Sequence, residues 1–159
     1  MNAASDAVDG ARLVLMRFSA GGVVFCADAD QIESVAVFDR TVSDELVWLR
    51  DELGCAGAPV NGSPVVFTIK TGTGLPYRVV VDWMLDVCEV AGKEIRSFPP
   101  LVEPFAMEQG LWGVIFPGGR IAFLIDFLLL ERGKRSLGGG EPSRSRLFAA
   151  GREAVSAGS

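Results

Sequence analysis

The chain has 159 residues and is 49% hydrophobic, which excludes a largely disordered protein and leaves room for one ordinary domain or two very small ones. Its net charge is −5, and it contains no histidine, so the commonest general base and the commonest metal ligand are both missing. Three widely spaced cysteines, Cys26, Cys55 and Cys88, form no C-x-x-C motif. We therefore expect no metal and no cofactor.

The first elements indicate β structure. Apolar runs of strand length at 13–18 and 23–26 flank Gly21 and Gly22, which is typical of a β-hairpin. Residues 28–35 then suit a short helical turn that leads into an apolar stretch at 35–38.

Residues 43–54 carry the strongest helix signal, and we predict a helix at 44–53. Ser43 is a favourable N-cap, and Gly54 suits the left-handed residue that follows a last turn. Acidic residues at the start suit the helix dipole, and leucines recur on one face, the residues being Asp44, Glu45, Leu46, Leu49 and Leu53. Residues 54–64 have the composition of a loop.

The second half predicts further strands and one more helix. Alternating residues at 65–70 and an apolar run at 77–81 indicate strands on either side of a loop at 71–76. Segments 111–116 and 120–125 flank Gly118 and Gly119, which favours a tight hairpin. Asp126 can cap a short last helix at 127–131.

Charge is unevenly placed along the chain. Residues 132–159 hold six basic and two acidic side chains, a net charge of +4, whereas residues 1–131 hold nine basic and eighteen acidic ones, a net charge of −9. We interpret 132–159 as a flexible basic tail with a joint at 138–140 and a weak helix at 144–155. The acidic body argues against nucleic-acid binding.

The chain also contains an internal repeat. A shift of 52 residues places Gly22 on Gly74, and Phe25 on Tyr77. Each copy reads as strand, glycine turn, strand, acidic residue, short apolar turn and valine, so the pattern predicts two copies of one β unit. The copies diverge after Val35.

Motifs in the second half resemble those of the CheW-like domain of bacterial chemotaxis coupling proteins. The pattern of an apolar strand, an aspartate, an apolar turn, an acidic residue and a valine is present at 79–87, with Asp82 as its aspartate. A diproline follows at 99–100, and a closing hairpin ends at Asp126. The resemblance covers about residues 12–37 and 65–130.

The resemblance implies an all-β domain of two small SH3-like barrels in tandem, with short helices. We place this domain at 1–131, with subdomains at about 11–64 and 65–131. It also implies a non-enzymatic, cytoplasmic signalling adaptor that binds a CheA-like histidine kinase, a chemoreceptor or both. Nothing between Phe38 and Pro64 matches the family's usual contact hairpin. Segment 46–49 either replaces the final strand of the first barrel or forms a new helix.

Two alternatives to this function stay open. The chain could be a scaffold module of another signalling system, or a small enzyme that uses Asp82 and Asp126 as an acid/base pair. The competing interpretation of these aspartates is that each caps a helical turn after its strand. A shared concave pocket would favour the enzyme.

The candidate partner-binding residues centre on segment 38–54, where the repeat breaks. We predict that this segment sets partner choice and that Trp48 projects at the edge of an apolar face ringed by carboxylates. The full candidate set is Asp44, Glu45, Leu46, Trp48, Leu49, Trp83 and Trp112. We expect neither a signal peptide nor a membrane span.

Overall fold

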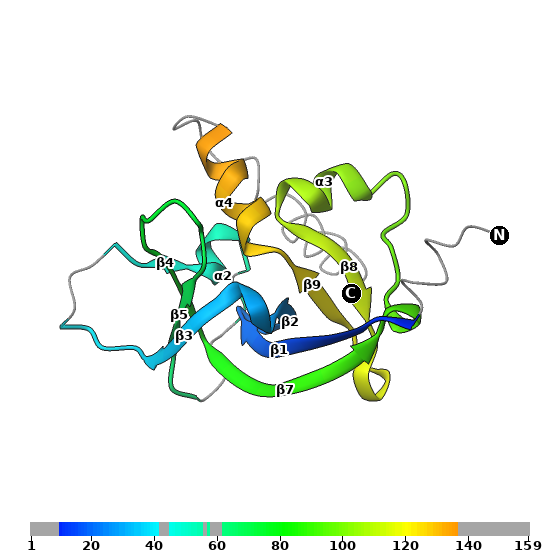
Figure 1. Cartoon of the computed structure of the whole chain (residues 1–159), viewed down its shortest axis with the longest axis horizontal. Helices are drawn as coiled ribbons and strands as arrows, with labels where there is room; N and C mark the ends of the chain where they lie inside the picture. The colour runs from blue at the N-terminus through cyan, green and yellow to red at the C-terminus, as the bar shows by residue number, and fades with distance from the viewer. Residues whose placement is uncertain (1–9, 42–44, 56, 58–61, 137–159) are drawn as a thin grey trace, which may run out of the picture.

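The computed structural model describes residues 10–41, 45–55, 57 and 62–136, and it confirms a mostly β fold (Figure 1). One sheet has five strands in the order β7-β1-β2-β9-β8. Its strands are β1 (Arg12–Ala20), β2 (Val23–Asp28), β7 (Trp83–Ala91), β8 (Leu111–Ile115) and β9 (Ala122–Ile125). The other sheet has the order β3-β5-β6-β4, with β3 (Ile32–Val37), β4 (Val47–Trp48), β5 (Val65–Ile69) and β6 (Tyr77–Val81).

The described helices are short. They are η1 (Ala29–Gln31), α2 (Leu49–Glu52), η2 (Gly92–Glu94), α3 (Glu103–Glu108), η3 (Pro117–Gly119) and α4 (Phe127–Ser136). In Figure 1, α3 and α4 lie on the upper side of the molecule, whereas β7, an edge strand of the five-stranded sheet, runs along the lower side. The fold class predicted from the sequence, all-β with short helices, is confirmed.

The predicted hairpins are present with the expected turns. Strands β1 and β2 pair antiparallel around Gly21 and Gly22, whose φ angles are +58° and +80°. Strands β8 and β9 pair antiparallel around Gly118 and Gly119, with φ of +62° and +78°. Glycine adopts these positive φ angles without the steric cost that other residues incur.

The repeat is real at the level of strands, but its two copies exchange a strand. The first copy supplies β1, β2 and β3, and the second supplies β5, β6 and β7. Strand β7 pairs with β1, whereas β3 pairs with β5, so each hairpin receives its third strand from the other copy. Each sheet therefore combines both halves of the sequence and does not follow the division at residue 64. Neither sheet closes into a barrel among the described strands. Outside the named strand pairs, the backbones of Arg96 and Val114 exchange two hydrogen bonds of 2.9 Å.

Alternating side chains build two cores on opposite faces of the five-stranded sheet. In β2, Cys26 faces the smaller core, whereas Phe25 and Ala27 face the larger one. The larger core joins the two sheets and α4 through Phe18, whose ring centroid lies 5.2 Å from that of Phe67 and 6.0 Å from that of Phe127. The near-continuous apolar runs in the sequence reflect this burial on both faces.

The helix predicted at 44–53 is wrong for most of its length. Val47 and Trp48 form strand β4, which pairs parallel with β6, and only Leu49–Glu52 is helical. The β-branched and aromatic pair suits a strand, and pairing with β6 outweighs local helix propensity. The parallel pairing of β9 with β2 matches that of β4 with β6, so β4 occupies the place of a final strand. Gly54 has the predicted positive φ, at +65°.

Two further expectations are wrong, and two fall on residues outside the described ranges. The apolar turn expected at 83–87 is part of the nine-residue strand β7, because β1 offers it a partner along most of its length. The last helix extends to Ser136 and does not end at residue 131. Helix α3 was not anticipated. The joint at 138–140 and the weak helix at 144–155 lie outside the described residues.

Candidate functional site

Asp82 lies at a buried junction between the two copies of the repeat. Its Oδ2 accepts a hydrogen bond of 2.8 Å from the backbone N–H of Gly21, and its Oδ1 lies 3.8 Å from Nη1 of Arg50. A Cβ on Gly21 would come within 2.5 Å of the carbonyl oxygen of Cys55, so this turn is held between Asp82 and the segment after α2. Asp82 therefore binds a hairpin turn and does not cap a helix, in contrast to the expectation from the sequence.

Asp126 does cap a helix. Its Oδ1 accepts hydrogen bonds of 2.9 Å from the N–H of Leu128 and 3.3 Å from that of Leu129, at the start of α4. The side chain of Gln31 donates a further bond of 2.9 Å to the same oxygen, and its Oε1 accepts one of 3.1 Å from the N–H of Phe127. This network ties η1 to α4.

The two aspartates are not brought into one site. Each is engaged in its own network, and they share no partner among the described contacts. Two open hollows, of about 460 and about 130 Å³, both border Thr71, and neither is lined by either aspartate. Neither hollow is therefore the shared pocket that the acid/base hypothesis requires.

The candidate partner-binding residues of segment 38–54 differ in how far they are exposed. Leu49 is fully buried in the larger core, so it is not available to a partner, in correction of the prediction. Trp48 and Leu46 are half-buried, and Glu45 is exposed. The Trp48 ring packs edge-on against Phe38, with 5.1 Å between the ring centroids. Asp44 lies outside the described residues.

The other two candidate tryptophans are at the surface. Trp83 is 37% exposed at the start of β7, and one face of its ring is so close to Gly62 that a Cβ there would lie 2.1 Å from it. Trp112 is 36% exposed because the register between β8 and β9 shifts at this residue, which leaves it as a bulge. Both can contact a partner without leaving their strands.

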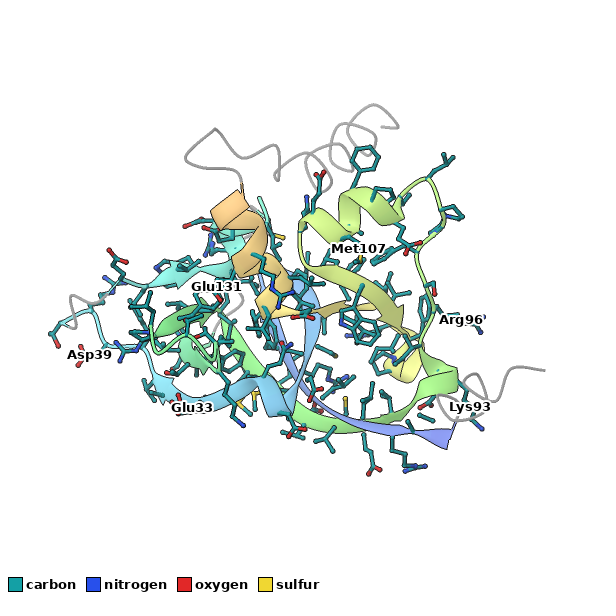
Figure 2. The ribbon with its side chains drawn as sticks, turned by 45° about the horizontal axis from the view of Figure 1, so that its top comes forward. Glu33, Asp39, Lys93, Arg96, Met107 and Glu131 are labelled. Carbon is teal, nitrogen blue, oxygen red and sulfur yellow. The ribbon has the colours of Figure 1, made fainter. Side chains whose placement is uncertain are left out.

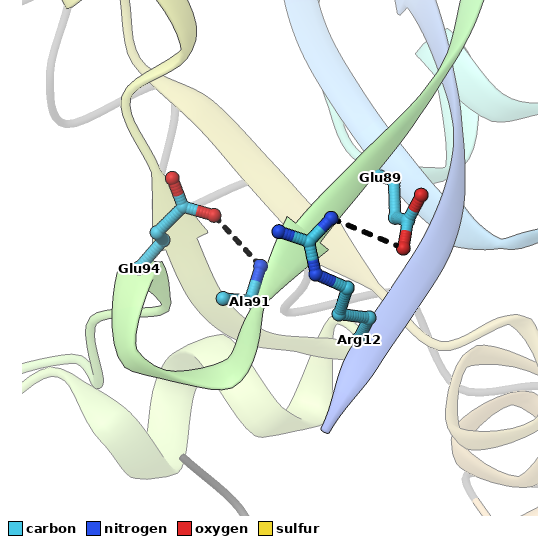
Figure 3. Close-up of polar contacts among 4 residues, drawn as sticks. All are labelled: Arg12, Glu89, Ala91 and Glu94. Carbon is cyan, nitrogen blue, oxygen red and sulfur yellow. Dashed lines mark hydrogen bonds and ion pairs between the residues drawn. The ribbon is translucent and has the colours of Figure 1, made fainter. Parts of the chain in front are cut away.

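One exposed apolar face lies on the paired strands β1 and β7. Val14 on β1 and Val87 on β7 are each about half exposed. Val87 lies opposite Met16, which is two residues after Val14 on β1. At the end of this strand pair, Nη1 of Arg12 lies 3.3 Å from Oε1 of Glu89, as Figure 3 shows. The next turn is fixed by Glu94, which accepts a hydrogen bond of 2.7 Å from the N–H of Ala91 (Figure 3). β7 thus offers an apolar surface with a charged border.

A second exposed apolar surface lies at α3, and sequence reasoning missed it. Leu101, in the turn before α3, is 87% exposed, and Phe105, on α3, is 61% exposed. A signal was present, since Pro104 suits the first turn of a helix and Gly110 suits its end. Neither surface has the geometry of a catalytic cleft, whereas both suit contact with another protein.

The titratable groups of the smaller core are held neutral or paired. Burial raises the pKa of the Cys26 thiol to about 12, and burial also raises the pKa of Cys88. Arg17 forms a two-pronged ion pair with Asp86, which includes a hydrogen bond of 2.8 Å from Nε, and this bond raises the pKa of Arg17. Buried thiols with raised pKa values are poor nucleophiles.

Two further features limit the chemistry that the described residues offer. They contain no group of three or more cysteine, aspartate or glutamate side chains placed to hold a metal ion. No helix in the described ranges has the length and apolar character needed to cross a membrane.

The architecture consists of two small sheets with exchanged third strands, each extended by a parallel strand and a helix. This fold is similar to that of a CheW-like domain. The crystal structure of the scaffolding protein TtCheW from Thermoanaerobacter tengcongensis is similar, with a TM-score of 0.60 and 12% sequence identity. The similarity covers 76% of this chain and 92% of TtCheW. No protein-family model and no curated protein matches the chain. At this identity the likeness shows the fold.

Proposed function

We propose that the chain is a non-enzymatic signalling adaptor of the chemotaxis coupling type, which binds a CheA-like histidine kinase, a chemoreceptor or both in the cytoplasm. The observation that carries this proposal is the likeness to a scaffolding protein over 92% of that protein's length. Fold alone does not determine function, so the proposal also rests on the surfaces. Exposed apolar side chains on several elements suit an adaptor that contacts more than one partner.

Segment 38–54 is the proposed determinant of partner choice. It contains the edge strand β4, and its exposed Glu45 and half-buried Leu46 and Trp48 lie together in sequence at that edge. A tryptophan that is packed on one side by Phe38 is held in place, which lowers the entropy lost when a partner covers its remaining surface. The acidic surroundings favour a partner patch that is apolar at its centre and basic at its border.

Binding to purified proteins tests the function directly. The CheA-type kinase and the cytoplasmic part of a chemoreceptor from the same organism are titrated separately against the full chain by calorimetry. We expect at least one of them to bind, and we expect Trp48→Ala to weaken that binding about tenfold or more. Failure of both to bind at concentrations of about 100 µM contradicts the proposed function.

A matched control separates the interface from general damage. Leu75→Ala removes an apolar side chain that is 65% exposed, at the far end of β5 and β6 from Val80, the residue that pairs with Trp48. We expect this variant to bind as the unmodified chain does. Equal losses in both variants would contradict the assignment to segment 38–54, and a large fall in the unfolding temperature of Trp48→Ala would show that Trp48 acts through stability.

A further inference from the structure

The α3 ridge, defined as Leu101, Pro104 and Phe105, is an apolar surface that the folded body leaves uncovered. The opposite side of α3 is buried through Ala106, and Gly110 fixes the helix end against α4. Phe105 therefore projects from a supported helix and Leu101 from the turn that precedes it, and neither can turn into a core that is already filled. Figure 2 shows Met107 on α3 and Glu131 on α4.

The two charged side chains on α3 itself are both acidic. Glu103 and Glu108 lie on α3 and are exposed. The sequence contains no lysine or arginine between residues 97 and 119, so no positive charge within this stretch offsets them. An occupant of the ridge is therefore expected to combine apolar side chains with positive charge.

Residues 144–155 of the same chain have this composition. Their three arginines, Arg144, Arg146 and Arg152, and one glutamate give a net charge of +2 (3 − 1). If the segment is helical, its apolar and small residues recur at the spacing of one helix face. These residues are Leu147, Phe148, Gly151, Ala154 and Val155.

The segment is also within reach of the ridge. Helix α4 starts beside α3, since the N–H of Asp126 donates a hydrogen bond of 2.7 Å to the carbonyl of Gly110, and its ten residues extend about 15 Å away from that point. Residues 137–143 can span about 23 Å when extended, because each residue contributes about 3.3 Å. The connection is therefore long enough for residues 144–155 to return along α4 to α3.

We propose that residues 144–155 bind the α3 ridge of their own chain, with Leu147 and Phe148 on Leu101 and Phe105 and with arginines beside Glu103 and Glu108. This intrachain contact is independent of the proposed adaptor function. It makes the ridge available to other proteins only when the segment is displaced.

Limited proteolysis of the full chain is the first test. Trypsin cleaves after Arg144 and Arg146, and bound residues are cleaved more slowly than free ones. We expect Phe105→Ser to accelerate these cleavages at least fivefold, because the substitution removes the exposed apolar contact without disturbing the core. Phe116→Ser is the matched control, since Phe116 is 53% exposed on the β8–β9 hairpin, and it should leave the rate unchanged. Equal rates in all three proteins overturn the proposal.

Binding in trans provides the second test. A labelled synthetic peptide of residues 137–159 is titrated by fluorescence anisotropy against the full chain carrying L147S and F148S, whose own segment should no longer occupy the ridge. We expect the peptide to bind the L147S/F148S chain, and we expect this binding to weaken at least tenfold when F105S is added to that chain. The unmodified chain should bind the peptide more weakly than the L147S/F148S chain, because its own segment competes for the ridge. Absence of binding, or binding that ignores F105S, overturns the proposal.

Two other occupants have distinct signatures. A concentration-dependent dimer that F105S abolishes would assign the ridge to the segment of a second copy and would overturn the intrachain contact. Binding of the full chain to vesicles of 70% phosphatidylcholine and 30% phosphatidylserine, lost with F148S but unchanged by F105S, would assign residues 144–155 to a membrane surface and would also overturn it.

Discussion

Replacement of Asp82 by alanine tests whether the junction between the two copies of the repeat is a major source of stability. The substitution leaves the buried N–H of Gly21 without its acceptor, which costs about 1–3 kcal/mol. It also removes the charge that faces Arg50, but the contact is 3.8 Å long and the Arg50 side chain is 27% exposed, so this loss is about 0.5 kcal/mol. Together these losses come to about 1.5–3.5 kcal/mol.

The assay is thermal and urea unfolding of Asp82→Ala, Asp82→Asn and the unmodified chain. For a chain of this size, 1 kcal/mol lowers the unfolding temperature by about 2–4 °C, so Asp82→Ala should unfold about 3–14 °C lower. Asp82→Asn keeps an oxygen that can accept from Gly21, and it should lose only about 1 kcal/mol. Glu89→Ala is the control, because its ion pair with Arg12 is exposed and contributes less than about 0.5 kcal/mol.

Two results would refute this reasoning. If Asp82→Ala unfolds within about 0.5 kcal/mol of the unmodified chain, the hydrogen bond to Gly21 does not hold the junction. If Asp82→Asn is as destabilised as Asp82→Ala, the ion pair with Arg50 dominates, contrary to the distance and exposure observed.

Further predictions concern packing and pH. Gly110→Ala should lower the free energy of unfolding, measured in urea, by about 2 kcal/mol or more. The reason is that φ is +75° at Gly110 and that an added Cβ would lie 2.9 Å from the carbonyl oxygen of Asp126. A loss below about 0.5 kcal/mol would contradict the tight contact with α4. Leu53→Ala should cost about 2–5 kcal/mol, since Leu53 is fully buried, and an unfolding midpoint close to that of the unmodified chain would place it outside the core. Burial raises the pKa of Cys26 from 9.0 to about 12, so the folded chain keeps a proton that the unfolded chain releases, and the free energy of unfolding should fall as pH rises from 9.0 to about 12. Cys26→Ala should reduce the slope of that fall, and an unchanged slope would show that other groups cause it.

Local features of the fold could be predicted from the sequence. The two hairpins were predicted because their glycines and flanking apolar runs are adjacent in the chain, and short turns determine which residues pair. The repeat was detectable for the same reason, since equivalent turns recur 52 residues apart. The exchange of β3 and β7 could not be predicted, because the sequence of a strand does not indicate which distant strand it will pair with.

Segment 45–54 shows where local signals mislead. Its acidic start, leucine spacing and terminal Gly54 are all those of a helix, yet Val47 and Trp48 pair with β6. The free edge of β6 offers hydrogen bonds that a short isolated helix cannot match. Leu49 was among the candidate partner-binding residues, but it is the first residue of α2 and lies in the larger core. The positions of Trp83 and Trp112 stay consistent with the predicted interface, which only binding data can test.

The exchange of third strands has a consequence for how the two halves of the chain are held together. Within each copy of the 52-residue unit, the third strand does not pair with its own hairpin. Two separate copies, however, could each supply the strand that the other lacks, as β7 and β3 do here. The architecture thus has the form of two intertwined like units joined in one polypeptide. Because the reciprocal strands hold both halves together, the chain can differ between its two units at segment 38–54 without separating them.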